Sequence, residues 1–215
     1  MFGVATINSA AYQPLANITE LSKIEYCNRH GYSFYSLVGY KYSPNMGFNK
    51  IHYMLEILQQ TPSLDWLLWC DCDAMITNLS IRIEDKIDNN FHFITPVDVN
   101  DINVGNLLVR NTEEGRNYLR MIIDKEPIYI KHIMAEQQVI IDSHKDYTTV
   151  VKVVPQKHMN SYEPQLYLPQ NIDTRMDILG TSGVWEQGDW IVHWPGLPLS
   201  TRINQALALS KLIIR

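Results

Sequence analysis

The chain has 215 residues, of which 46% are hydrophobic and 19% are charged. That length can bury a sizeable core in one domain, and the composition excludes a disordered chain. The formal net charge of −5 argues against nucleic acid as a partner, because a duplex-binding surface normally needs a basic face. No apolar run reaches the ~18 residues that would span a membrane.

The N-terminus and the cysteines bear on the cellular compartment. Residues Met1 to Ile7 lack the basic flank and the long apolar segment of a signal peptide. Three cysteines are too few, and odd in number, for a disulfide framework, which favours a reducing compartment. We therefore expect a cytoplasmic protein without a membrane span.

The chain opens with a predicted strand and a predicted helix. The short apolar run Phe2–Ile7 is typical of a strand. In the helix that follows, Asn17 and Glu20 have the spacing of a capping box, and Gly31 ends the helix. The hydrophobic face of this helix is predicted to contain Leu21, Ile24 and Cys27.

The next segments continue the alternation of strands and helices. Residues Ser33–Val38 are aromatic and β-branched, which predicts a strand. A helix then ends at Thr61-Pro62, and its apolar face is predicted to contain Ile51, Met54, Leu55 and Leu58. The continuous apolar run Trp66–Cys70 predicts a strand that is buried on both faces. This order predicts an α/β fold, a parallel sheet with helices on both sides.

The second half yields further expected elements and one irregular stretch. The strands are expected at Phe91–Thr95, Asn106–Arg110, Thr148–Val154 and Trp190–His193, and the helices at Thr112–Asp124, Ala135–Ser143 and Thr201–Ile214. Residues Gln156–Gln187 are rich in Pro, Tyr, Asn and Gly. A long loop region of this kind in an α/β protein favours a surface that faces substrate.

Asp71-Cys72-Asp73 is the sharpest local feature, because it follows the most hydrophobic predicted strand directly. Ligands of open α/β sheets bind outside the carboxyl ends of the strands. Two carboxylates at positions i and i+2 can both reach one ion, and carboxylate oxygens select Mg²⁺ or Mn²⁺. The alternative is an ordinary turn, since charged residues commonly follow a strand.

Two later segments offer side chains of the same kind. His193 ends an apolar strand before a Pro-Gly turn, and its imidazole suits a Mn²⁺ site. Taken alone, this pattern favours a partly buried structural histidine. Asn103 and Gly105 precede another strand, where Gly lets the backbone approach a ligand and Asn suits sugar hydroxyls. Taken alone, these residues are better explained by a hairpin or a bulge.

Other polar and aromatic residues carry weaker signals. Glu136 and Gln137 open a predicted helix, where a carboxylate is favourable without any catalytic role. Lys50 either meets a phosphate or is an exposed lysine. The aromatic side chains of the irregular stretch either stack on a sugar ring or pack the loop; they are Tyr162, Tyr167 and Trp185.

Taken together and in this order, six segments resemble glycosyltransferase family 34, the yeast α-galactosyl and α-mannosyltransferases and the plant xyloglucan xylosyltransferases. The resemblance runs from about residue 20 to residue 196. Its segments are Tyr26–Tyr32, Lys50 with Asp65–Ile76, Ile102–Asn111, Glu136-Gln137, Val154–Tyr162 and Gly188–Gly196. The chain also resembles the small glycosyltransferases with which large algal viruses (chloroviruses) build capsid glycans, a viral setting that would place it in the host cytoplasm.

The resemblance implies a GT-A fold, with a mixed, mostly parallel central sheet flanked by helices, in a single domain over residues 1–215. It also implies a retaining transfer of a hexose or pentose from a nucleotide-sugar, preferably a UDP-sugar, to a glycan or glycoprotein acceptor. The implied cofactor is Mn²⁺ or Mg²⁺. The family usually carries a membrane anchor and stem, which this sequence lacks, so we expect a free enzyme or one domain of a larger chain.

The resemblance also implies roles for individual residues. Asp71, Asp73 and His193 would hold the metal. The donor would be bound by Thr6, Ile7, Asn8, Lys50, Asp71, Cys72, Asp73, Asn103 and Gly105. Gln137 and Glu136 would be catalytic, with Gln137 facing the anomeric carbon; the family usually has Asp where Glu136 stands.

Retention favours attack from the face of the leaving group, with the Gln137 amide stabilising an oxocarbenium-like centre. A covalent intermediate on Glu136 is the alternative.

Two other functions remain open at this point. One is a sugar nucleotidyltransferase, although Ile7-Asn8-Ser9-Ala10-Ala11 lacks the glycine and lysine of its phosphate loop. The other is a non-catalytic sugar-binding module.

Overall fold

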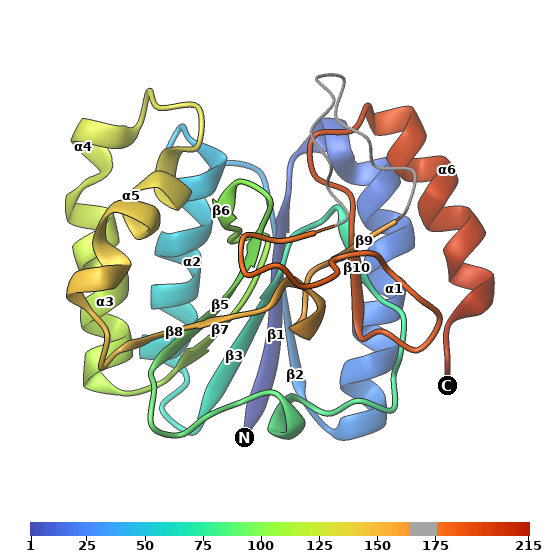
Figure 1. The fold of residues 1–215 in the computed structure, drawn as a ribbon, viewed down its shortest axis with the longest axis horizontal. Coiled ribbons are helices and arrows are strands. Elements are labelled where there is room, and N and C mark those ends of the chain that lie inside the picture. Colours follow the sequence, from blue (N-terminus) through green and yellow to red (C-terminus); the bar gives the residue numbers. More distant parts are fainter. Residues whose placement is uncertain (164–175) are drawn as a thin grey trace.

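A computed structural model describes residues 1–163 and 176–215. Its main sheet has the strand order β2-β1-β3-β7-β5-β6, with β8 paired to β5 (Figure 1). The strands are β1 (Phe2–Asn8), β2 (Ser33–Val38), β3 (Trp66–Cys70), β5 (Phe93–Asp98), β6 (Asp101–Ile102), β7 (Asn106–Arg110) and β8 (Val151–Val154). β1, β2, β3, β5 and β8 run in one direction, whereas β6 and β7 run against it. The sheet is therefore mixed and mostly parallel.

Helices lie on both sides of this sheet: α2, α3 and α5 on one side, and α1 and α6 on the other (Figure 1). The helices are α1 (Gln13–His30), α2 (Met46–Gln60), α3 (Glu113–Asp124), α4 (Glu126–Tyr129), α5 (Ala135–Ser143) and α6 (Leu199–Leu209). Short 3₁₀ turns cover Ala10–Tyr12, Ile83–Asp85, His144–Asp146, Gln156–His158 and Ser210–Leu212. The predicted arrangement of a sheet between two helical layers is confirmed.

A second, small sheet was not foreseen from the sequence. It has the order β4-β10-β9, in which β4 (Ala74–Ile76) and β10 (Ile191–His193) are antiparallel and β9 (Ser161–Tyr162) runs parallel to β10. Only its strand β10 was expected, within Trp190–His193; β4 and β9 have three and two residues, too few to leave a periodic pattern. This sheet matters because it carries the chain away from Asp73 and brings β10 back beside it.

The strand β3 divides the hydrophobic core into two layers, as its continuous apolar sequence predicts. All five of its residues are buried. Leu67 and Trp69 pack with α2, α3 and α5, whereas Trp66, Leu68 and Cys70 pack on the opposite face with α1. Successive side chains of a strand point to opposite faces, so a strand covered on both sides must be apolar throughout.

The predicted face of α1 is wrong in part. Gly31 does end the helix in a left-handed conformation with φ 68°, and Cys27 is buried. The helix begins at Gln13, however, with Pro14 in its first turn, so Asn17 is not its N-cap. Leu21 and Ile24 are 66% and 38% exposed. The buried face instead contains Leu15, Ala16, Thr19, Ser22, Lys23, Tyr26 and Cys27.

The other predicted elements agree with the structure within a few residues. β7 and α5 have the expected bounds. α2 ends at Gln60 with Thr61 as its C-cap, next to the expected end at Thr61-Pro62. Of its predicted apolar face, Leu55 is half-buried and the other three residues are buried. α6 ends at Leu209 rather than Ile214, because a 3₁₀ turn follows and Ile214 then bridges to Asn78. Tyr167 lies outside the described residues.

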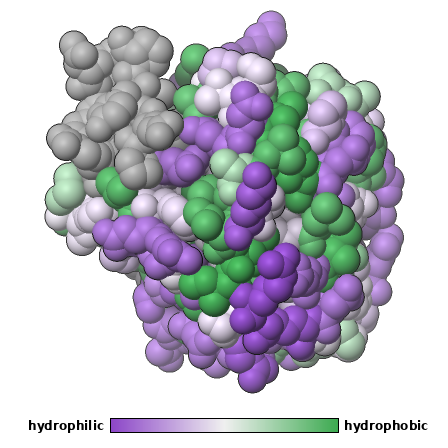
Figure 2. Space-filling model, turned by 90° about the vertical axis from the view of Figure 1, so that its right-hand side faces the viewer, coloured by the Kyte–Doolittle hydropathy of each residue, from purple (hydrophilic) through white to green (hydrophobic). Residues whose placement is uncertain are grey.

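The remaining features of the fold are its cysteines, the hydropathy of its helices and its exposed apolar residues. All three cysteines are free. In the described ranges, no helix is both long enough and apolar enough to cross a membrane. On the side where α6 lies, apolar areas alternate with polar ones (Figure 2); exposed Leu21 and Ile24 of α1 and Leu207 of α6 contribute apolar surface.

Candidate active site

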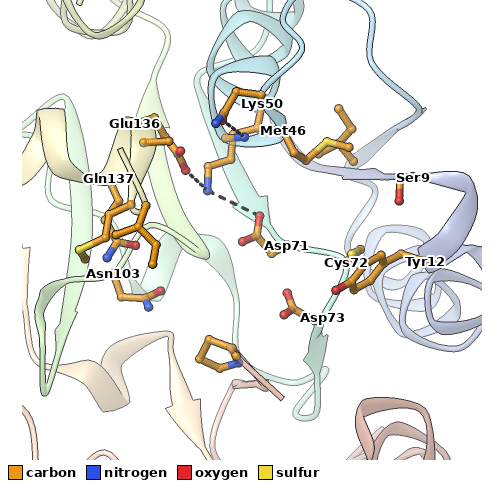
Figure 3. Close-up of a pocket in the computed structure, with 18 of the residues that line it drawn as sticks. Ser9, Tyr12, Met46, Lys50, Asp71, Cys72, Asp73, Asn103, Glu136 and Gln137 are labelled. Atoms are coloured by element: carbon orange, nitrogen blue, oxygen red, sulfur yellow. Dashed lines mark hydrogen bonds and ion pairs between the residues drawn. The ribbon is translucent and has the colours of Figure 1, made fainter. Parts of the chain in front are cut away.

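A cavity of about 990 Å³ opens beyond the carboxyl ends of β1 and β3 (Figure 3). Most of the candidate residues line it: Ile7, Asn8, Lys50, Asp71, Cys72, Asp73, Asn103, Glu136 and Gln137. Further lining residues include Tyr12, Tyr40, Asn45, Met46, Gly47, Tyr162 and Gly196. The structure therefore brings together candidate residues from five separate segments at the sheet edge where the sequence placed the site.

Three candidates do not line this cavity. Thr6 is fully buried within β1, and its hydroxyl lies 3.4 Å from the Lys23 ammonium. This placement departs from the expected contact with a nucleotide, because Thr6 points to the opposite face of the strand from Ile7. Gly105 and His193 lie behind the lining residues, next to one another.

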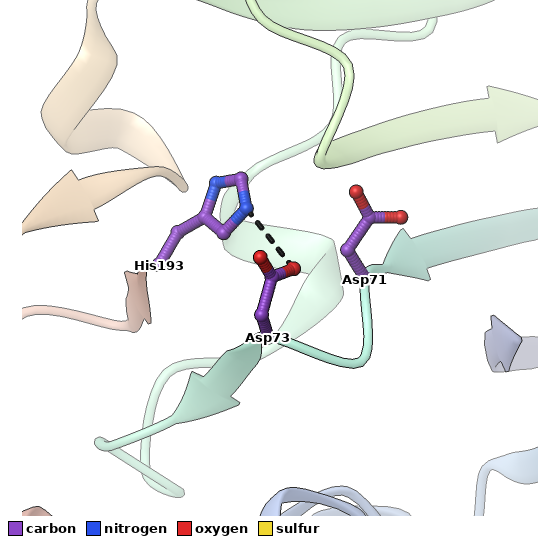
Figure 4. Close-up of side chains that lie close together, drawn as sticks. All are labelled: Asp71, Asp73 and His193. Carbon is purple, nitrogen blue, oxygen red and sulfur yellow. Dashed lines mark ion pairs between the residues drawn. The ribbon is translucent and has the colours of Figure 1, made fainter. Parts of the chain in front are cut away.

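Asp71, Asp73 and His193 form a compact cluster (Figure 4). One ligand atom of each lies within 4.8 Å of the others, and no other such group of His, Cys, Asp or Glu occurs in the described part of the chain. Asp71 follows β3, Asp73 precedes β4, and His193 ends β10. Pairing of β10 with β4 places His193 opposite Ala74, so the small sheet delivers the imidazole to the carboxylates.

Asp73 is the most constrained of the three. Its Oδ1 lies 3.3 Å from His193 Nε2, and its Oδ2 lies 2.7 Å from Arg202 Nη1. Burial acts to raise the pKa of this carboxyl, but the charges of His193 and Arg202 outweigh it and lower the pKa to about 2. Asp73 is therefore ionised at neutral pH. No sequence pattern pointed to Arg202, which reaches Asp73 from α6.

The ring of His193 is held from its other side. Its Nδ1 lies 2.8 Å from Asn160 Oδ1, which also accepts a hydrogen bond from Asn106 Nδ2 at 2.9 Å. With Nδ1–H donating to Asn160, Nε2 is the ring nitrogen that faces Asp73 and that would coordinate a cation in place of its proton. Two carboxylates and one imidazole nitrogen suit Mn²⁺ or Mg²⁺, so this set of donors fits a divalent cation.

Gly105 makes room for this imidazole. A Cβ on Gly105 would overlap the ring of His193. We expect Gly105→Ala to displace the ring and to weaken Mn²⁺ affinity at least about tenfold, the usual effect of disturbing a ligand's support. Isothermal titration with MnCl₂ measures this. Gly3→Ala is the matched control, because a Cβ there meets only side-chain atoms at 3.0 Å or more; equal affinity of both variants would contradict the expectation.

Lys50 is the buried cation of the site. Its ammonium donates to Glu136 Oε1 at 2.9 Å and to the Val104 carbonyl at 3.0 Å, and it lies 3.7 Å from Asp71 Oδ1. Burial alone would lower its pKa, but the carboxylates of Asp71 and Glu136 raise it above the ordinary value. Lys50 is therefore a permanent positive charge between two carboxylates (Figure 3), not the exposed lysine of the alternative interpretation.

Glu136 is a buried, ion-paired carboxylate rather than a free one. It is the second residue of α5, after Ala135, whose φ of 43° is unusual for a residue with a side chain. A Cβ on Gly47 would overlap the Glu136 carboxylate, so any larger residue there would displace this carboxylate from its present place. Gly47 was missed in the sequence, where a glycine near a helix start has no distinctive pattern.

Asn103 and Gln137 flank the same part of the cavity (Figure 3). The Asn103 amide donates to Asp98 Oδ2 and to the Tyr162 hydroxyl, each at 3.0 Å. The Tyr162 hydroxyl in turn donates to Asp98 Oδ2 at 2.7 Å. Gln137 Oε1 lies 3.4 Å from the Val104 amide, a long contact that leaves this half-buried side chain free to turn toward a ligand.

Comparison with known proteins shows which family this chain resembles. The model of the galactosyl transferase GMA12/MNN10 family matches residues 4–90 and 86–197. An α-1,2-galactosyltransferase of Schizosaccharomyces pombe is 28% identical over 229 residues, covering 85% of this chain and 56% of that protein. An uncharacterised α-1,2-galactosyltransferase of the same yeast is 25% identical, covering 87% and 58%. The chain spans just over half the length of these curated relatives.

Solved structures agree with the fold. A glycosyltransferase involved in the glycosylation of the major capsid of PBCV-1 aligns with a TM-score of 0.74 at 17% identity, covering 95% of this chain and 98% of that one. The galactosyltransferase LgtC, solved in complex with donor and acceptor sugar analogs, aligns with a TM-score of 0.65 at 11% identity, covering 99% and 96%. The likeness to viral capsid glycosyltransferases is thus confirmed for the fold. With a GT-A fold and a family model that matches most of its length, the chain belongs to the galactosyl transferase GMA12/MNN10 family, glycosyltransferase family 34.

Proposed function

We propose that this chain transfers a sugar from a nucleoside-diphosphate donor to a glycan or glycoprotein acceptor, with retention of configuration and with a divalent metal. The observation that carries the proposal is the convergence of Asp71, Asp73 and His193 beside a cavity of about 990 Å³. A UDP-sugar is the favoured donor on the resemblance to the family. The transferred sugar is a hexose or a pentose, depending on which nucleotide-sugar the cavity binds.

Asp71, Asp73 and His193 would hold Mn²⁺ or Mg²⁺. A cation bound there supplies positive charge to a departing diphosphate. Arg202 already occupies Oδ2 of Asp73 and so leaves Oδ1 as the oxygen that faces His193. Asp71 Oδ1 is similarly engaged by Trp69 Nε1 at 2.6 Å. Each aspartate therefore has one oxygen held by a neighbour and one available.

The remaining lining residues divide into two groups. Ile7, Asn8 and Cys72 border the cavity at the end of β1 and are assigned to the nucleoside side of the donor. Lys50 and Asn103 border it near Glu136 and Gln137 and are assigned to the donor sugar and phosphates. Burial and its acidic neighbours raise the pKa of the Cys72 thiol, so Cys72 contributes as a neutral side chain, not a thiolate.

For the chemical step we propose attack from the face of the leaving group. Glu136 is buried and bound to Lys50 at 2.9 Å, which disfavours it as a nucleophile because its charge is already compensated. The departing phosphate oxygen would accept the proton of the acceptor hydroxyl, so no protein base is needed. Gln137 would stabilise positive charge at the anomeric carbon through its amide dipole.

A thermal-shift experiment tests metal and nucleotide together. We expect UDP to stabilise the chain with Mn²⁺ far more than with EDTA, because diphosphate and the two aspartates repel one another without a cation. Ligand at ~100 times its Kd adds about 2.7 kcal/mol, which raises the Tm of a chain of this size by roughly 5–10 °C. Equal shifts in Mn²⁺ and in EDTA would reject the metal bridge.

Turnover separates this proposal from its two rivals. A sugar-binding module would bind nucleotide-sugar without releasing UDP. A nucleotidyltransferase would release diphosphate from a nucleoside triphosphate and a sugar phosphate. Release of UDP from a UDP-sugar, with anomeric configuration of the product read by NMR, supports only the transferase.

A further inference from the structure

The buried face of α1 contains polar groups where its sequence suggested leucine and isoleucine. Lys23 is fully buried, as is Thr19, and both lie on the side of α1 that faces the carboxyl ends of β1 and β3. In the described residues, the two hydrogen-bond partners of the Lys23 ammonium are neutral oxygen atoms. A buried ammonium destabilises the fold unless it donates hydrogen bonds. The hydrogen-bond acceptors of Lys23 therefore indicate its role.

Those partners are on the turn that carries the two aspartates. Lys23 Nζ donates to the Asp71 carbonyl at 2.8 Å, with Thr6 Oγ1 at 3.4 Å as a weaker second acceptor. Thr19 Oγ1 donates to the next carbonyl, that of Cys72, at 2.7 Å. Two successive carbonyls of one turn are thus bound by two side chains one helical turn apart on α1, at i and i+4.

The rest of the turn depends on the same atoms. The Asp71 carbonyl also accepts from the Ala74 amide at 3.0 Å, and the Asp71 amide donates to the Gly105 carbonyl at 2.8 Å. Holding the carbonyls of Asp71 and Cys72 fixes the backbone direction on both sides of Cys72. That direction decides whether the carboxylates of Asp71 and Asp73 point to a common place or apart.

We propose that Lys23, with Thr19, is a positioning residue that holds the Asp71-Cys72-Asp73 turn so that both carboxylates face one divalent cation. The inference rests on the proposed metal site. It assigns Lys23 no contact with substrate: the ammonium acts through the backbone beneath the site. It also explains why α1 buries Thr19 and Lys23 while leaving Leu21 and Ile24 exposed.

Positioning and plain electrostatics predict opposite effects for the loss of this charge. A positive charge near a cation site repels the cation, so removing only a charge would tighten Mn²⁺ binding. Removing an anchor loosens the turn and weakens Mn²⁺ binding. Lys23→Met distinguishes the two, because methionine keeps most of the length of the side chain and removes the ammonium.

The first measurement needs no metal. Hydrogen exchange of the Ala74 amide, followed by NMR on the metal-free chain, reports on the Asp71 carbonyl that Lys23 holds. We expect Lys23→Met to speed this exchange at least tenfold relative to the amide of Leu119 in α3, which reports global unfolding. Ser22→Ala is the matched control: Ser22 is buried on α1, but its hydroxyl donates only within the helix, to Thr19 O at 2.9 Å.

The second measurement is Mn²⁺ affinity by electron paramagnetic resonance. We expect Lys23→Met to weaken binding at least tenfold, Thr19→Val to weaken it several-fold with the Lys23 charge still present, and Ser22→Ala to leave it unchanged. If Lys23→Met does not fold, Thr19→Val decides both measurements. Unchanged Ala74 exchange, or tighter Mn²⁺ binding, overturns the positioning role. Absence of Mn²⁺ binding by the unmodified chain instead rejects the proposed function, and the exchange data still decide whether Lys23 anchors the turn.

Discussion

Asp73→Asn is expected to lower the rate of sugar transfer by at least about 10³-fold. The substitution keeps the shape of the side chain but removes the negative charge that would hold a cation against a diphosphate. The expected loss of rate is therefore that of losing the electrostatic stabilisation of the transition state by the cation. The substitution also weakens the pairing with Arg202 and His193. Release of UDP from a UDP-sugar at saturating Mn²⁺ measures the rate.

Asp177→Asn serves as the matched control for this prediction. Asp177 is another buried aspartate, but its oxygens accept hydrogen bonds from Gln156 N and from Thr181, and it does not line the cavity. We expect it to lose some stability and to keep most of the transfer rate. If Asp73→Asn transfers sugar at a rate near that of Asp177→Asn, Asp73 is only structural and the proposed metal site is misplaced.

The second large effect is expected at Gln137. Gln137→Ala should lower kcat by one to three orders of magnitude, the scale of losing one preorganised polar group at a charged transition state. The affinity for UDP should change little, because Gln137 lies on the opposite side of the cavity from the residues assigned to the nucleoside. Steady-state kinetics with separate kcat and KM, together with UDP titration, tests both statements.

Glu136→Gln is the companion variant, because it separates the two retaining mechanisms. If Glu136 only pairs with Lys50 and positions ligands, this variant keeps much of its activity, since glutamine still accepts the hydrogen bond of Lys50. If Glu136 is a nucleophile, nearly all activity is lost. A glycosyl adduct on Glu136, detected by intact mass with a slow donor analogue, would establish the covalent mechanism against the one proposed here.

The sequence alone predicted the frame of this molecule. The continuous apolar run of β3 and the periodic apolar face of α2 were placed within a few residues, because both patterns record the burial of apolar surface. Asp71 and Asp73 followed from their position after the most buried strand. The same reasoning failed on α1, where periodicity favoured Leu21 and Ile24, whereas Thr19 and Lys23 are buried through partners distant in the sequence.

The family resemblance supplied what local patterns did not. By itself, His193 favoured a structural histidine, and Glu136-Gln137 was no evidence of a site. Only the order of six segments connected them to Asp71 and Asp73. Gly47 and Arg202 escaped both approaches, since neither lies in a matching segment.

The sequence determined most of the longer strands and helices, the α/β type of the fold, and the two carboxylates that follow its central strand. Only the tertiary structure decided which side chains surround these two carboxylates. Antiparallel pairing of β4 with β10 sets His193 beside Asp73, and α6 adds Arg202 to the same carboxylate. Close approach of α2 and α5 requires Gly47 to face Glu136. Each of these contacts joins residues far apart in the chain, and a local pattern records burial but not the identity of the partner.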